Sequence, residues 1–169
     1  GLYLDGLPLV ARCQRQFEGL LAARLPRLAA HLNAEGVVPT MYCSQWFITV
    51  FATTLPFSVL LRVWDVFLLE GLKTVHRVGL EVLRGEEEEL LSLRFEQLVQ
   101  RLGARRGGVP GPHTDTDAFL RAALRASVTA VVEEAGRIYD RELQEFPGGG
   151  GGGGTGWPRS PETEGRAVG

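Results

Sequence analysis

Sulfur-containing side chains are scarce in this sequence, which holds two cysteines and one methionine among its 169 residues. Cys13 and Cys43 stand far apart, and no secretory leader precedes them. Disulfides persist mainly in oxidising compartments, so we expect two reduced thiols in the core of a cytosolic protein. The methionine, Met41, is internal and the sequence opens with Gly1, which predicts a fragment of a longer protein.

An excess of one charge sign is also missing, because the formal net charge is −2. No segment carries a dominant basic stripe, and a nucleic-acid partner is therefore not expected. The hydrophobic share of 44% is ordinary for a globular protein, and the length suits one domain with a moderate core.

Catalytic and metal-binding constellations are missing as well. His31, His76 and His113 are scattered, with no carboxylate or cysteine at ligand spacing. The sequence has no Gly-x-Ser-x-Gly elbow and no cysteine–histidine signature, and the loop 103–112 lacks the Gly-Lys-Ser/Thr ending of a phosphate loop. We therefore predict no catalytic, cofactor-binding or metal-binding residues, and a small helical enzyme with its own active site is disfavoured.

Charged residues are absent between Gly36 and Leu61, a run long enough to suggest a membrane span. The run nevertheless contains Gln45, Pro56 and several hydroxyl side chains, and it lacks the expected flanking anchors. Two buried helices joined at a Thr-Thr-Leu-Pro step explain it better. We expect a cytoplasmic protein that is at most peripheral to endomembranes, with only indirect membrane association.

Helical periodicity is what the sequence does contain, and alternating strand patterns are not seen. Pro26 suits the first turn of a short helix that stops at Gly36. A further segment begins near Thr40 and places an aromatic and apolar face on one side. The fold class predicted from these patterns is all-α, a multi-helix bundle.

The segment Pro56 to Glu70 is the most apolar of the predicted helices. Thr54 is a candidate cap, and Gly71 ends the helix. Only Ser58, Arg62 and Asp65 form a narrow polar stripe, and a helix that is apolar around most of its circumference belongs inside a bundle. We therefore predict that this helix is the buried spine of a larger helical domain. One apolar face is formed by Phe57, Leu60, Leu61, Trp64, Phe67 and Leu68, and it is widened by Val59, Val63 and Val66.

The next helix is predicted to turn Leu72, Val75, Val78, Val82 and Leu83 inward. Its polar side chains are predicted to face solvent: Lys73, His76, Arg77, Glu81 and Arg84. Four glutamates, 86–89, follow. They suit a solvated helix start, where the helix dipole favours acids, and the alternative is a basic partner.

The C-terminal third is predicted to hold one long helix and a tail. Thr114 and Asp117 resemble a capping box, and the apolar face after them extends to Tyr139, a helix of roughly 40 Å. Seven glycines, 148–154, cannot repay their backbone entropy, so a flexible tail is expected, in which Trp157 is weak evidence of docking. The predicted division is 1–145 for the helical domain and 146–169 for the tail.

Six linked pieces of sequence follow one another between Met41 and Leu83: Ser44-Gln45-Trp46-Phe47, Phe51, Leu55-Pro56-Phe57, Leu61-Arg62-Val63-Trp64-Asp65, Glu70-Gly71 and Arg77-Val78-Gly79-Leu80. Together they resemble the third signature of the TBC domain, whose members activate Rab-type small GTPases. The resemblance extends over about residues 1–145 and implies an all-helical C-terminal part of such a domain. The signature residues expected to act mainly through structure are Trp46, Phe47, Pro56, Arg62, Trp64, Asp65, Glu70 and Gly71.

The resemblance also implies a role in vesicle trafficking. It implies a catalytic mechanism in which two side chains are supplied to the GTPase. An arginine from an Ile-x-x-Asp-x-x-Arg motif neutralises charge on the transferring phosphoryl group, and a glutamine from a Tyr-x-Gln motif positions water. Neither motif occurs in this sequence. Arg62 lies inside the signature, on a helix expected to be buried, and Gln14 and Gln45 lack the tyrosine. The implied function is a Rab GTPase activator of which this chain is an inactive part. Its implied partners are a Rab-type GTPase and the rest of the TBC domain.

Two alternatives remain open at this point. The missing motifs also suit a non-catalytic helical adaptor that binds a small GTPase or a partner helix. Asp65 either contacts a partner or catalytic loop, or pairs with Arg62 or caps a neighbouring helix. Because the third and fourth helices have wide apolar faces, we further predict an exposed apolar patch and a tendency to associate.

Overall fold

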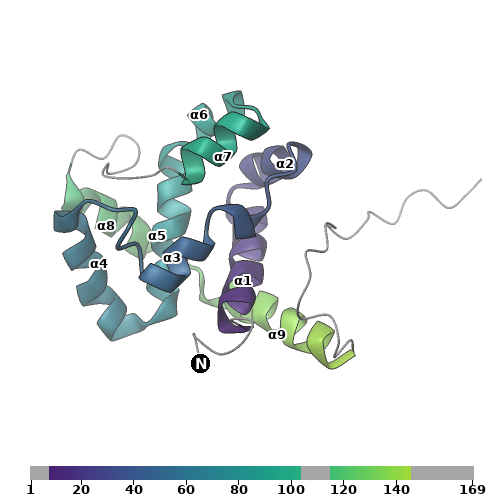
Figure 1. The fold of residues 1–169 in the computed structure, drawn as a ribbon. Helices are drawn as coiled ribbons and strands as arrows, with labels where there is room; N and C mark the ends of the chain where they lie inside the picture. Colours follow the sequence, from purple (N-terminus) through teal and green to yellow (C-terminus); the bar gives the residue numbers. More distant parts are fainter. Residues whose placement is uncertain (1–7, 104–114, 146–169) are drawn as a thin grey trace, which may run out of the picture.

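The computed structural model describes residues 8–103 and 115–145, and every regular element in these ranges is helical (Figure 1). The predicted all-α fold is confirmed. In chain order the elements are α1 (Pro8–Arg24), α2 (Pro26–Ala34), the 3-10 helix η1 (Pro39–Met41), α3 (Ser44–Thr49), α4 (Phe57–Glu70), α5 (Leu72–Gly85), α6 (Glu87–Ser92), α7 (Phe95–Gly103), α8 (Thr116–Arg125) and α9 (Thr129–Glu145). Within residues 8–103 and 115–145, every helix is too short or too polar for a transmembrane span.

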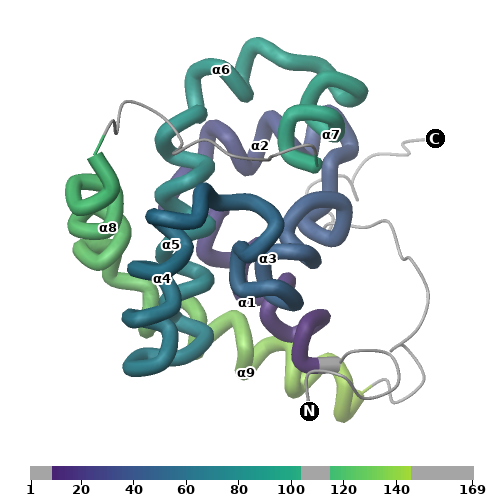
Figure 2. The backbone as a smooth tube through the Cα atoms, turned by 60° about the vertical axis from the view of Figure 1, so that its left-hand side comes forward, coloured from purple at the N-terminus to yellow at the C-terminus, as the bar shows by residue number. Residues whose placement is uncertain are grey.

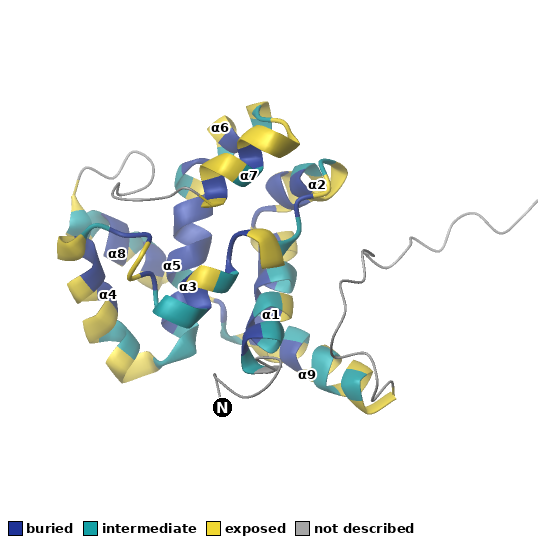
Figure 3. Cartoon of the chain, viewed as in Figure 1, coloured by how far each residue is buried: buried dark blue, intermediate teal, exposed yellow. Residues whose placement is uncertain are grey.

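Helix α5 is the central element of the bundle. It contacts α1, α3, α4 and α8, and Figure 3 shows it as the most continuously buried helix. The prediction that the segment Pro56 to Glu70 is the buried spine is therefore wrong, because α4 packs on one side of α5 and buries only Val59, Leu60 and Val63. The predictions of outward His76 and Glu81 are also wrong. The buried residues of α5 are Thr74, Val75, His76, Val78, Gly79, Leu80, Glu81, Val82 and Leu83.

A glycine lets α5 approach its neighbours so closely. A Cβ atom at Gly79 would lie 3.0 Å from a ring carbon of Phe17 and 3.2 Å from one of Trp46. Both aromatic side chains are fully buried. The position of α5 at the centre is thus set by a small residue that allows two large ones to pack against its backbone.

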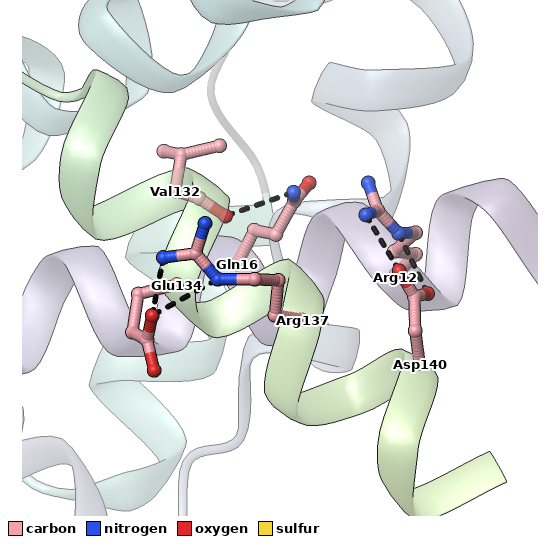
Figure 4. A network of polar contacts seen from close by, with 6 residues as sticks. All are labelled: Arg12, Gln16, Val132, Glu134, Arg137 and Asp140. Carbon is pink, nitrogen blue, oxygen red and sulfur yellow. Dashed lines mark hydrogen bonds and ion pairs between the residues drawn. The ribbon is translucent and has the colours of Figure 1, made fainter. Parts of the chain in front are cut away.

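Helices α2, α6 and α7 gather at one end of the bundle, and α9 crosses the other end beside α1 (Figure 2). Polar contacts join α1 and α9, as Figure 4 shows. Arg12 forms a bidentate pair with Asp140, and the Gln16 side-chain amide donates a buried hydrogen bond of 3.0 Å to the Val132 carbonyl. Gly136 makes room for both α1 side chains, since a Cβ there would lie within 3 Å of each.

The single long helix predicted after Thr114 is instead two helices, α8 and α9. Ala126 has an extended backbone (φ −67°, ψ 114°), and its N–H closes the last turn of α8 on the Ala123 carbonyl. The cap of α8 is Asp115, whose carboxylate accepts from the Asp117 N–H at 3.1 Å. The predicted cap, Thr114, lies outside the described residues.

The other helix ends lie where the sequence predicted them, except for the cap of α4. Pro26 opens α2, Gly36 follows its end with a positive φ of 74°, and Gly71 ends α4. Thr54 is not the cap of α4, because Pro56 occupies that position with an extended ψ of 148°. The acidic run does start a helix, α6, although its first member, Glu86, is buried beside Arg101. The residues 104–114 and 146–169, with His113 and Trp157, lie outside the described part of the chain.

Candidate functional site: the signature segment from α3 to α5

The aromatic residues of the signature segment anchor α3 to the core. Trp46 lies edge-on to Phe17 of α1 with ring centroids 5.8 Å apart, and Phe47 lies 4.9 Å from the imidazole of His76. Trp46 also stacks on Phe51 at 5.4 Å. Aromatic pairs at these separations add to the burial of their large apolar area. The short α3 is therefore stabilised by the packing of its aromatic side chains rather than by the hydrogen bonds of a long helix.

The chain between α3 and α4 turns through two left-handed residues. Val50 and Phe51 have φ of 47° and 62°, which is costly for residues with a Cβ and especially for a β-branched one. Trp64 of α4 donates an indole N–H hydrogen bond of 3.0 Å to the Val50 carbonyl. A signature tryptophan thus stabilises the strained turn that precedes its own helix.

The other end of α4 is built around a glycine. Gly71 has φ 70° and ψ −148°, a conformation that is essentially restricted to glycine. The carboxylate of Glu70, just before it, pairs with the guanidinium of Arg77 on α5. Arg77 also donates from Nε to the Ala126 carbonyl at 3.2 Å. Glu70 and Arg77 therefore connect the α4–α5 corner to the junction between α8 and α9.

Arg62 and Asp65 both lie on the exposed side of α4. Arg62 belongs to the predicted polar stripe of α4, but the expectation that its helix is buried is wrong, because more than half of its side chain is exposed. Its guanidinium lies 3.3 Å from the carboxylate of Asp117 on α8. The pairing of Arg62 with Asp65 is thus not seen, and Arg62 links α4 to α8 instead.

An apolar stripe lies on the outer face of α4. Its members, which we call the α4 stripe, are Phe57, Leu61, Trp64 and Leu68, with 73%, 45%, 41% and 82% of their surface exposed. The predicted exposed patch is therefore confirmed for the fourth helix. It is wrong for the third, since Trp46 and Phe47 of α3 are buried.

Buried titratable groups near the signature segment are held in their neutral forms. Burial raises the pKa of Cys13 to about 11 and raises that of Cys43 further. Both are free, so the prediction of reduced core thiols is confirmed, and neither is a ready nucleophile. Burial also lowers the pKa of His76, opposed by the hydrogen bond from the ring to the Leu72 carbonyl. Its Nε2 has no hydrogen-bond partner of good geometry among the described residues.

The contacts of the signature segment hold the main chain and the helices around α4 and α5 in place. Across residues 8–103 and 115–145, no three acidic, histidine or cysteine side chains form a group that could hold a metal ion. Seven of the eight signature residues take part in the contacts or backbone conformations described: Trp46, Phe47, Pro56, Arg62, Trp64, Glu70 and Gly71.

Sequence reasoning missed two parts of this region. Nothing in the residue types Val50 and Phe51 signals left-handed backbone, because glycine or asparagine is the usual sign of it. Arg77 was expected to face solvent. Its place in the signature pieces could have indicated that it makes a structural contact instead. Only 16% of its side chain is exposed, and its guanidinium pairs with Glu70.

Comparison with known proteins agrees with the signature. The model of the Rab-GTPase-TBC domain family matches residues 1–91. Carabin from Mus musculus is 38% identical over 153 residues, which covers 88% of this chain and 34% of the relative. The ecotropic viral integration site 5 protein homolog from Homo sapiens is 36% identical over 99 residues, which covers 59% of this chain and 12% of the relative.

A yeast relative extends the comparison. The GTPase-activating protein GYP5 from Saccharomyces cerevisiae is 36% identical over 101 residues, covering 60% of this chain and 11% of the relative. The chain thus spans between about a tenth and a third of the length of these relatives. The family model covers more than half of the chain, and this chain belongs to the Rab-GTPase-TBC domain family.

Proposed function

We propose that the natural protein containing this chain accelerates GTP hydrolysis by Rab-type small GTPases, and that this chain supplies helical scaffold without the two reacting side chains. Family membership supports the first part. The yeast relative, whose printed name is a GTPase-activating protein, supports it as well. The reaction class, phosphoryl transfer to water, needs a placed positive charge and an aligned nucleophile.

The proposal that this chain lacks the reacting arginine is supported mainly by the contacts of the two signature arginines within the chain. Arg62 pairs with Asp117, and Arg77 pairs with Glu70 and with the Ala126 carbonyl. Both guanidinium groups are thus engaged with acceptors of this chain, and their contacts join helices of the scaffold. The sequence also lacks an Ile-x-x-Asp-x-x-Arg and a Tyr-x-Gln. The reacting arginine and glutamine therefore come from another part of the TBC domain, which is a partner of this chain.

The signature residues serve the fold in this proposal. Trp46 and Phe47 anchor α3, Trp64 stabilises the turn at Val50, and Glu70 fixes the α4–α5 corner. The protein acts in the cytoplasm, peripheral to endomembranes, where it meets a membrane-attached Rab-type GTPase.

Replacing Arg62 in the natural protein tests the proposal that this chain does not supply the reacting arginine. Single-turnover GTP hydrolysis is measured on a panel of Rab-type GTPases with the natural protein and with its Arg62→Ala variant. We expect the variant to retain acceleration within about threefold, whereas loss of an arginine finger costs on the order of 10³–10⁵ in rate. A loss of that size in Arg62→Ala would assign the finger to Arg62 and contradict the proposal.

A non-catalytic adaptor is the second candidate, and the two absent motifs favour it. The same experiment separates the candidates. A natural protein that binds a loaded Rab-type GTPase and leaves hydrolysis at the intrinsic rate is an adaptor.

A further inference from the structure

Helix α9 buries little of its own surface. Of its 17 residues, Val132 and Gly136 are buried, whereas nine of the 14 residues of α5 are. The last turns of α9, residues 137–145, contain no buried residue, and Figure 3 shows this end of the helix as exposed or intermediate. Burial of apolar surface is the main source of stability, so α9 is less firmly held than the central helix.

The contact between α9 and α1 is close but polar. The Gln16 side-chain amide donates to the Val132 carbonyl at 3.0 Å (Figure 4). Gly136 makes room for it, because a Cβ at that position would lie 2.7 Å from the same amide nitrogen. On the α1 side, a Cβ at Gly19 would lie 3.1 Å from the Cβ of Ala135. Small residues and an amide therefore bring these two helices together, where large apolar side chains hold α5.

Ion pairs hold the outer part of α9. Arg12 pairs with both carboxylate oxygens of Asp140, and Arg15 pairs with Glu142 at 3.1 Å. All four side chains are between 35% and 50% exposed. Pairs that are exposed to this extent contribute little each, and salt screens them.

The junction before α9 is held separately from the helix itself. Arg77 of α5 donates to the Ala126 carbonyl at 3.2 Å, and Arg24 of α1 donates to the Ser127 carbonyl. Val128, the next residue, is fully buried. The start of α9 is therefore fixed to the core by contacts that do not involve the helix beyond it.

The polar groups of the α1–α9 contact lose little when the helices separate, because water satisfies amides, guanidinium groups and carboxylates. Permanent interfaces are usually apolar, and more polar ones are typical of parts that separate. We propose that α9 is a reversibly docking strap, which leaves α1 as one unit while the helices around α5 stay folded. A helix of this length is marginal in water, so undocking also melts α9. Undocking does not depend on the GTPase-activating function proposed above.

Native-state hydrogen exchange of the 169-residue chain tests the proposal. The amides of α9 should exchange as one group, at least about 100-fold faster than the slowest amides of α5, because they require only the smaller opening. Raising NaCl from about 0.05 to 1 M should quicken exchange in α9 about three- to tenfold, since the ion pairs are screened. Exchange in α5 should not change.

A charge exchange tests whether the ion pairs hold the strap. Arg12→Glu alone and Asp140→Arg alone should each quicken exchange in α9 about three- to tenfold. The two together should restore slow exchange, because opposite charges then face each other again. Arg27→Glu is the matched control. It breaks an exposed pair with Glu88 between α2 and α6, so exchange in α9 should not change.

A wedge at Gly136 separates docking from the folding of the chain. A Cβ there would lie 2.7 Å from the Gln16 amide nitrogen and 2.8 Å from a guanidinium nitrogen of Arg12, and leucine adds further carbons in the same space. Leucine is also a better helix former than glycine, so faster exchange in Gly136→Leu would come from lost docking. We expect α9 to lose its protection and its helical circular dichroism, while α5 keeps most of its protection.

Three outcomes would overturn the proposal. One is exchange of α9 and α5 in a single event at low and high salt alike. Another is a Gly136→Leu chain that unfolds throughout or is obtained only in insoluble form, because the whole fold would then need α9. The third is a double charge variant that exchanges as fast as the single ones.

Discussion

The guanidinium of Arg12 donates two hydrogen bonds, of 2.9 and 2.8 Å, to the carboxylate of Asp140 and so joins the first described helix to the last (Figure 4). Arg15 extends the contact to Glu142 at 3.1 Å. Helix α9 lies beyond the residues 1–91 that the family model matches. It is nevertheless attached to α1 along much of its length, which makes residues beyond the match part of the same packed unit.

Replacing Asp140 by Asn tests the strength of this pair. Both side chains are more than a third exposed, so the loss in the free energy of unfolding should be small, about 0.5–1 kcal/mol. The hydrogen bond from Arg12 lowers the pKa of Asp140, so its contribution is present above the unfolded pKa of about 3.9 and is lost as pH falls through the lower folded value. Urea unfolding at pH 7 and pH 3 measures both effects. The variant should differ from the natural chain mainly at pH 7, and Glu145→Gln, an exposed acid of the same helix, should show no comparable loss.

Replacing Gly79 by Ala should destabilise the protein. The new Cβ would lie 3.0 Å from the ring of Phe17 and 3.2 Å from that of Trp46, and both rings are buried and held. Overpacking costs about 1–3 kcal/mol and the better helix propensity returns up to about 1, so we expect a net loss of about 1–2 kcal/mol. Thermal unfolding measures it. Gly103→Ala, where a Cβ meets open space, is the control and should be neutral or stabilising.

Replacing Trp64 by Phe should loosen the turn at Val50 more than the rest of the fold. The change removes the indole N–H that donates to the Val50 carbonyl and keeps an aromatic ring. The loss should be about 0.5–1.5 kcal/mol. Amide hydrogen exchange should quicken for residues 50–55 while α5 is unaffected. Uniform quickening across the chain would mean that Trp64 supports the whole core instead.

Acid should destabilise the protein through His76. Burial lowers the pKa of the folded imidazole below 6.5, so below about pH 6.5 the unfolded chain takes up a proton that the folded chain refuses. Stability therefore falls as pH drops from about 7 to about 5.5. His76→Phe, which keeps a ring beside Phe17 and Phe47, should flatten this slope in melting temperatures across that range. An unchanged slope would assign the effect to other groups.

The helices and most of their ends followed from sequence because they depend on local chemistry. Pro26 and Gly71 act within one turn of the chain, and the period of apolar residues marks each helix. Which helix is central did not follow. α4 is the more apolar one, but α5 has Gly79, and close approach of Phe17 and Trp46 decides the packing. Apolar composition alone does not distinguish a core face from a face that binds something else.

The predictions for two polar residues of α5 were wrong because residue type alone does not show which partners a side chain finds. His76 and Glu81 were expected outward from their residue types. In the structure His76 satisfies one ring nitrogen with the carbonyl of Leu72, one turn back, and Glu81 pairs with Arg84. Such local partners are not visible in periodicity. The break at Ala126 was missed because no glycine or proline marks it.

If the reacting arginine and glutamine lie outside this chain, the chain alone should leave GTP hydrolysis unchanged. This is measured as single-turnover GTP hydrolysis by a panel of Rab-type GTPases, each loaded with GTP and mixed with the purified 169-residue chain in excess. Every member should hydrolyse GTP at its intrinsic rate. Clear acceleration of any member by the chain alone would show that the chain itself supplies reacting side chains.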